Sequence, residues 1–94
     1  MIFLILFFNC MIAFGAAGQR CMALSVAIFV GKGDASQGVI NDLVARASRL
    51  KVGPGMDPDT DIGPIITQEA QQRIEHLIQA GVDDGADLLL DGRY

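Results

Sequence analysis

The chain has 94 residues, enough for one small domain or for part of a larger one. Apolar residues make up 51% of the sequence and the mean hydropathy is +0.39, which excludes disorder of the whole chain. The net charge is −4 and no basic patch with interleaved aromatic residues is present, so nucleic acid is excluded as a partner.

The N-terminal stretch is apolar and carries no charge before Arg20. A membrane-spanning helix needs about 20 apolar residues, and Asn9 interrupts this shorter run. A secretory signal would begin with a positively charged region, which is absent. We therefore interpret residues 1–10 as an apolar segment of unclear origin, and membrane association through residues 1–14 remains the alternative.

The next elements predicted along the chain are a strand and a helix. Residues 24–30 form a continuous apolar, β-branched run that is typical of a strand buried on both faces. Asp34 is a candidate helix N-cap, and Gln37 completes a pair resembling a capping box. Apolar residues then recur at helical spacing as far as Leu50, which predicts a helix that begins near Asp34.

Residues 52–66 contain three prolines and three glycines, which indicates a linker rather than a helix or a central strand. Thr67 is a candidate cap for a second helix, which we expect to stop at Gly81. Residues 87–90 are typical of a short strand. The order strand, helix, helix, strand predicts an α/β layer with a parallel sheet and a right-handed crossover.

Two short motifs fail their own requirements. Residues 31–33 read Gly-Lys-Gly between a strand and a helix, but Ser36 occupies the place of the third small residue of a dinucleotide fingerprint. The aspartates 57, 59 and 61 alternate as in a calcium loop, but the required glycine and glutamate are replaced by Ile62 and Gln68. We therefore predict no cofactor-binding or metal-binding residues, and we expect His76 to be exposed on its helix.

Cys21 is the candidate nucleophile, and Arg20 precedes it directly. A thiolate is favoured by nearby positive charge or by a helix N-terminus, and the glycines before Cys21 suggest a loop that opens into a helical turn. Free backbone N–H groups at such a place could also receive an oxyanion. From chemistry alone, however, an inert buried cysteine is the commoner case.

The residues around Cys21 add a further indication. The stretch FGAAGQRCMALSVAIFVG resembles the catalytic-cysteine segment of aldehyde dehydrogenases, and its Gln-Arg-Cys-Met-Ala form resembles the CoA-acylating methylmalonate-semialdehyde dehydrogenases. The stretches DLVARASRLKVGPGMDPDTDIGPIIT and GADLLLDGR resemble the sequences that follow in this family. The resemblance identifies residues 11–94 as a fragment of the catalytic domain.

The resemblance implies that Cys21 attacks an aldehyde carbon and that Arg20 holds the substrate carboxylate. It implies NAD as the oxidant, CoA as the acyl acceptor, a mitochondrial location and a homo-oligomeric enzyme. The NAD-binding domain of the family has no counterpart in this sequence, so we expect the isolated chain to be inactive and only marginally stable. The alternatives are a non-catalytic, membrane-associated small protein and a partner that joins a full-length relative through unpaired strand edges.

Overall fold

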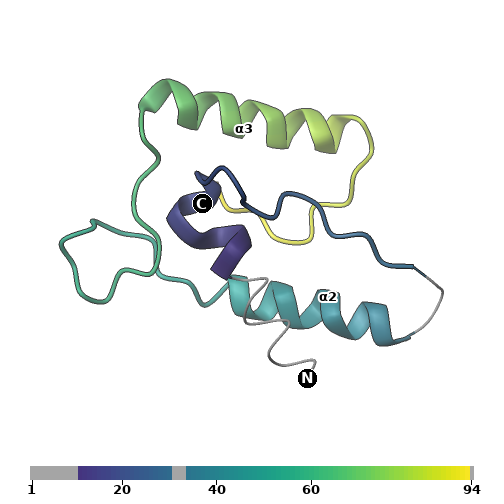
Figure 1. The fold of residues 1–94 in the computed structure, drawn as a ribbon. Coiled ribbons are helices and arrows are strands. Elements are labelled where there is room, and N and C mark those ends of the chain that lie inside the picture. The colour runs from purple at the N-terminus through teal and green to yellow at the C-terminus, as the bar shows by residue number, and fades with distance from the viewer. Residues whose placement is uncertain (1–10, 31–33, 94) are drawn as a thin grey trace. The chain divides into compact units, whose positions relative to one another are not determined.

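The computed structural model describes residues 11–30 and 34–93 of the chain. Within these residues the named elements are the 3₁₀ turn η1 (Gly15–Gly18), helix α2 (Asp34–Ala47) and helix α3 (Gln68–Asp83), as Figure 1 shows. The chain divides after Pro64 into two compact units. The first unit contains η1 and α2, and the second contains α3.

Helix α2 confirms the prediction of a helix that begins near Asp34. Its apolar residues at helical spacing are half-buried: Val39, Ile40, Leu43, Val44 and Ala47. The Gln37 amide donates to Asn41 Oδ1 at 3.0 Å, so it does not complete the expected capping box. Asn41 lies four residues further along the same helix face, where side chains of a helix are neighbours.

The N-terminus of α3 forms as the sequence predicts. Thr67 is the N-cap in an extended conformation, and its hydroxyl oxygen accepts the Ala70 N–H at 3.1 Å. Glu69 lies in the first turn. A hydrogen bond from its own backbone N–H, and next one from the Thr67 hydroxyl, lower the pKa of the Glu69 carboxyl. The ionised carboxylate therefore stabilises the helix start.

The C-terminus of α3 lies further along the chain than predicted. The helix runs through Gly81 to Asp83, and Gly85 adopts a φ of +97°. The Gly85 N–H donates to Val82 O at 2.9 Å and the Ala86 N–H donates to Gly81 O at 3.0 Å. These two bonds form a Schellman motif around Gly85, so the prediction that Gly81 stops the helix was wrong.

The proline-rich linker contains a closed loop. Val52 and Ile62 form an isolated parallel bridge, and the Gly53 N–H donates to Ile62 O at 3.0 Å. The Asp61 carboxylate accepts the Lys51 N–H at 2.9 Å at the same place. The linker thus has neither a helix nor a strand, as predicted, and its residues 51–62 are joined at their base.

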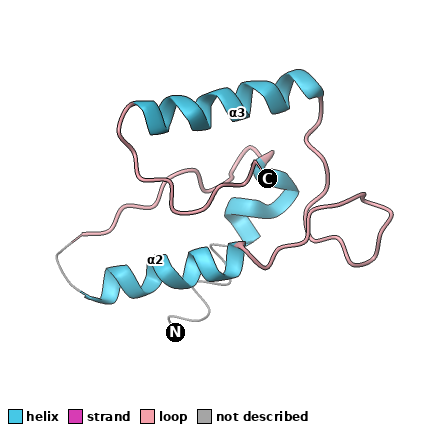
Figure 2. Cartoon of the chain, turned by 180° about the vertical axis from the view of Figure 1, so that it is seen from behind, coloured by secondary structure: helices cyan, strands magenta, loops and turns pink. Residues whose placement is uncertain are grey.

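The strand predictions are not confirmed. Figure 2 shows helices and loops, and residues 24–30 and 87–90 belong to no strand in the described part of the chain. Val26, Ile28 and Val30 are 70%, 84% and 93% exposed. A strand is defined by ladder hydrogen bonds to a neighbour, and residues 11–30 and 34–93 provide none for these segments. The two helices of the predicted α/β fragment are therefore confirmed, and its parallel sheet is not.

No side chain in the described ranges is buried. No helix there combines the length and the apolar character that a bilayer crossing requires. Residues 1–10, on which the membrane alternative chiefly depends, lie outside the described residues, as do residues 31–33.

Two glycines of α3 give a matched pair of stability predictions. Gly81→Ala should raise the free energy of unfolding by up to about 1 kcal/mol, because a Cβ there meets nothing within 4 Å and alanine favours helix. Gly85→Ala should lower it by about 1 kcal/mol, because the left-handed conformation disfavours a side chain. Urea titration followed by circular dichroism measures both free energies of unfolding. If the two substitutions changed the free energy in the same direction, the placement of the helix end between Gly81 and Gly85 would be contradicted.

The lowered pKa of Glu69 predicts a pH dependence. The stabilisation by Glu69 should be fully present well above its ordinary value of 4.5 and should be lost as the pH falls through the lower folded value. The difference in unfolding free energy between the parent chain and Glu69→Gln should shrink on acidification. In a Thr67→Ala background, which lacks the hydroxyl donor, this free-energy difference should be smaller. A free-energy difference that does not vary with pH would disprove the stabilisation by ionised Glu69.

Candidate active site: the cysteine turn

A left-handed turn precedes the predicted site residues. Ala16 and Ala17 have φ values of 53° and 55°, and Gly18 has a φ of 74°. The Gln19 N–H closes the turn by donating to Ala16 O at 3.0 Å. The left-handed region costs a non-glycine residue about 1 kcal/mol or more, so small side chains suit this turn. The backbone strain lies directly before Arg20 and Cys21.

The Gln19 side chain links this turn to a distant part of the same unit. Its Nε2 donates to Ala16 O at 2.9 Å and to Pro64 O at 3.4 Å. The first bond reinforces the left-handed turn, and the second joins it to a residue 45 positions away. Our sequence reasoning missed this role, because no local pattern indicates a partner at that separation.

Cys21 is an exposed free thiol in a turn. The Ala23 N–H donates to Arg20 O at 3.2 Å, which closes the turn around Cys21. No hydrogen bond to the Cys21 N–H is recorded within residues 11–30 and 34–93. The thiol is therefore open to a solute, and the neighbouring N–H can donate to an oxygen placed beside the sulfur.

The sequence suggested that Cys21 lies near a helix N-terminus, and the structure does not confirm this. The helical residues 11–14 and the left-handed turn at residues 16–18 precede it, and the segment of residues 23–30 continues without a helix. The β-branched residues of that segment disfavour helix, which is the physical reason. A helix dipole therefore does not act on Cys21 here, and the positively charged Arg20 directly precedes it in the same turn.

The Arg20 guanidinium lies against Gly15. A Cβ placed on Gly15 would lie 3.1 Å from Cζ, 3.2 Å from Nη2 and 3.3 Å from Nε of Arg20. Arg20 is nevertheless exposed, and no ion pair to it is recorded in the described ranges. Arg20 and Cys21 are thus adjacent, exposed residues of one turn. Figure 1 shows this turn directly after the purple helical coil.

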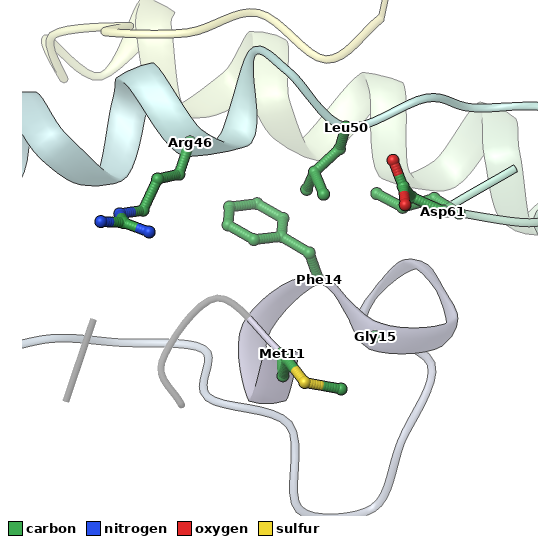
Figure 3. A pocket seen from close by; sticks show the side chains of 7 residues that line it. Met11, Phe14, Gly15, Arg46, Leu50 and Asp61 are labelled. Carbon is green, nitrogen blue, oxygen red and sulfur yellow. The ribbon is translucent and has the colours of Figure 1, made fainter. Parts of the chain in front are cut away.

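A cavity of about 360 Å³ lies in the same unit, and Gly15 is among the residues that line it (Figure 3). Its lining is mostly apolar and comprises Met11, Phe14, Gly15, Arg46, Leu50, Asp61 and Ile62. Arg46 pairs with Asp42 at 3.7 Å, and Asp61 accepts the Lys51 N–H, so both charged groups already stabilise the fold. Neither Arg20 nor Cys21 is among the residues that line this cavity.

The acidic loop does not assemble a metal site. Asp57 Oδ1 accepts the Asp59 N–H at 3.0 Å in an Asx turn, and Asp61 is engaged with Lys51. No cluster of three potential ligands occurs in the part of the chain that the structure describes. His76 is exposed on α3, as predicted.

A model described as the aldehyde dehydrogenase family matches residues 9–94, a range that includes the whole cysteine turn. The chain belongs to the aldehyde dehydrogenase family. It is 59% identical over 80 residues to the mitochondrial methylmalonate-semialdehyde dehydrogenase (acylating) of Arabidopsis thaliana. That alignment covers 85% of this chain and 13% of the plant protein.

Two solved structures of this family match 98% of the chain with a TM-score of 0.91 each. One comes from Sinorhizobium meliloti 1021, is assigned as a methylmalonate-semialdehyde dehydrogenase in complex with NAD, and is 40% identical. The other is the methylmalonate-semialdehyde dehydrogenase DddC of Oceanimonas doudoroffii, at 36% identity. This chain spans 18% and 19% of those two chains. The chain is therefore similar in fold to a segment of each of these much longer aldehyde dehydrogenases.

The left-handed turn predicts opposite effects at adjacent positions. Ala17→Gly should raise the free energy of unfolding by about 1 kcal/mol, because glycine tolerates this conformation. Gly18→Ala should lower it by about 1 kcal/mol for the same reason. Chemical denaturation measures both changes. If Ala17→Gly destabilised the chain as an ordinary helical alanine would on replacement, the left-handed assignment would fail.

Proposed function

We propose that this chain supplies the nucleophile-bearing segment of an NAD-dependent, CoA-acylating aldehyde dehydrogenase that converts methylmalonate semialdehyde to propionyl-CoA. The observation that carries the proposal is the exposed Arg20–Cys21 pair on one turn. Its support is the 59% identity to the Arabidopsis thaliana enzyme and the 0.91 TM-score to two methylmalonate-semialdehyde dehydrogenases.

In this proposal Cys21 is the nucleophile. Its thiolate forms a bond to the aldehyde carbon while the carbonyl π pair moves onto oxygen, which gives a thiohemiacetal oxyanion. The Cys21 backbone N–H can donate to that oxygen as one half of an oxyanion hole. Transfer of a hydride from the thiohemiacetal carbon to NAD would restore the carbonyl as a thioester on the sulfur. In the acylating branch the thiol of CoA rather than water would then take the acyl group and release the Cys21 thiolate.

Arg20 binds the carboxylate of the semialdehyde. A guanidinium presents several in-plane N–H donors and remains charged at every relevant pH, so it suits bidentate recognition of a carboxylate. Since Arg20 and Cys21 are adjacent, a short substrate with a carboxylate near its aldehyde can reach both groups. Loss of carbon dioxide from the methylmalonyl unit gives the propionyl product.

The described residues do not fit the NAD pyrophosphate. Pyrophosphate binds at helix N-termini that are free of negative charge, but α2 begins at Asp34 and α3 has Glu69 in its first turn. We therefore assign no NAD contact to these residues. The cofactor enters the proposal through the NAD complex of the Sinorhizobium meliloti relative, and CoA enters through the acylating name of the plant relative.

A mitochondrial location belongs to the same proposal, because the Arabidopsis thaliana relative is named as mitochondrial. Assembly into a homo-oligomer, which the family resemblance implies, belongs to it as well. The membrane-associated alternative is not favoured, since the family match extends from residue 9 to residue 94.

A chimeric enzyme tests the proposal. The 80 matching residues of the Arabidopsis thaliana enzyme are replaced by those of this chain, and NADH formation is measured with methylmalonate semialdehyde and CoA. The chimera should be active, and Cys21→Ser should lower kcat at least about 10³-fold. Arg20→Gln should raise KM for methylmalonate semialdehyde roughly tenfold or more but change turnover of uncharged propanal little.

The isolated 94-residue chain is the matched comparison, and it should form no NADH under the same conditions. A chimera that folds and binds NAD but does not oxidise the semialdehyde would refute the proposal. Equal losses for the charged and uncharged aldehydes on Arg20→Gln would refute the role of Arg20 alone.

A further inference from the structure

The contact between Arg20 and Gly15 has a defined geometry. The three guanidinium atoms Cζ, Nη2 and Nε lie at nearly equal distances, 3.1 to 3.3 Å, from the position of a Cβ on Gly15. A planar group has three such atoms equidistant from a point only when its face is turned toward that point. The guanidinium therefore lies flat over Gly15, and its N–H donors, which lie in the plane, remain free to bind a carboxylate edge-on.

The backbone that carries Arg20 is fixed on both sides. Gln19 is tied to Ala16 O through its N–H at 3.0 Å and through its side chain at 2.9 Å. The Ala23 N–H holds Arg20 O at 3.2 Å. The position of the guanidinium therefore depends on the torsions of its own side chain and on the surface against which it lies.

Backbone conformation does not require glycine at position 15. Gly18 and Gly85 are the glycines with positive φ in the described ranges, and Gly15 is not among them. Alanine at position 15 would be free of backbone strain, but its Cβ would come closer to the guanidinium than the ordinary contact range of 3.4–4 Å. What glycine provides here is space for the flat guanidinium.

We infer that Gly15 is a positioning residue that holds the Arg20 guanidinium face-on, on the turn that carries Cys21, and thereby selects carboxylate-bearing aldehydes over uncharged ones. The inference rests on the proposed function, because it assigns to Arg20 the binding of the substrate carboxylate. A methyl group at position 15 requires the guanidinium to give way by a few tenths of an ångström. Because Arg20 is exposed, its long side chain meets this by moving to other rotamers in solvent, and the positive charge on the turn of Cys21 becomes less defined.

Alkylation of Cys21 in the full 94-residue chain tests the inference without NAD or CoA. The thiolate displaces iodide from iodoacetate, which carries a carboxylate, or from iodoacetamide, which is neutral. The ratio of the two rate constants at Cys21, read by peptide mass spectrometry, reports the charge beside the thiol. Arg20→Gln should lower this ratio about threefold at low salt. Gly15→Ala should lower it about twofold, toward the Arg20→Gln value.

Two controls separate positioning from a loss of structure. Gly38→Ala adds the same methyl group in α2, where nothing lies within 4 Å, and should leave the ratio unchanged. In the Arg20→Gln background, Gly15→Ala should have no effect on the ratio, because the group that it displaces is gone. An effect of Gly15→Ala that persists in that background would overturn the inference.

The remaining outcomes distinguish the inference from the proposal beneath it. If Arg20→Gln lowers the ratio but Gly15→Ala does not, the positioning role of Gly15 is refuted and the role of Arg20 stands. If Arg20→Gln leaves the ratio unchanged, the anion-binding role of Arg20 is refuted and the inference with it.

Discussion

Hydrogen bonds between near neighbours in sequence hold most of the described structure together. No described side chain is buried, so burial of apolar area contributes less here than in a complete domain. The Thr67 cap, the Schellman motif at Gly85 and the bonds from Gln19 to Ala16 each span five residues or fewer. The elements that form are those whose polar groups can be satisfied locally.

The turn that carries Cys21 is also held by local hydrogen bonds, and its backbone is strained as well. Ala16 and Ala17 adopt the left-handed region. The backbone N–H and the side-chain Nε2 of Gln19 both donate to the carbonyl oxygen of Ala16. Backbone strain of this kind persists where surrounding bonds over-determine it, and it is concentrated at functional sites. The turn fixes the backbone before Arg20 and Cys21, whose side chains remain exposed for chemistry.

The same constraint explains what the sequence could predict. Thr67 and the apolar spacing of α2 carry local signals, and both helices were predicted with nearly correct starts. Gly81 and Gly85 are both plausible helix stops by residue type, and the choice depends on which one takes a positive φ. The strands at 24–30 and 87–90 could not be confirmed, because a strand depends on a partner that its own residues do not specify.

At the site, the motif around Cys21 indicated the nucleophile and the carboxylate-binding arginine, whose roles remain predictions. The supporting residues gave no such signal. Gly15 lies against the Arg20 guanidinium, where a Cβ would come within 3.1 Å of Cζ, and Gln19 donates to a carbonyl 45 positions away. Both are relations in three dimensions, which composition and periodicity do not encode.

The contacts that join the two ends of the loop at residues 51–62 should keep the position of the cysteine turn independent of the length of that loop. The Val52–Ile62 bridge and the Lys51–Asp61 bond join the two ends of the loop before the chain reaches Pro64. Insertions or deletions between these ends change only the closed loop. Each doubling of the loop length costs only about 0.6 kcal/mol in closure entropy. Pro64 O, which accepts from Gln19, can therefore stay in place when the length of the loop changes.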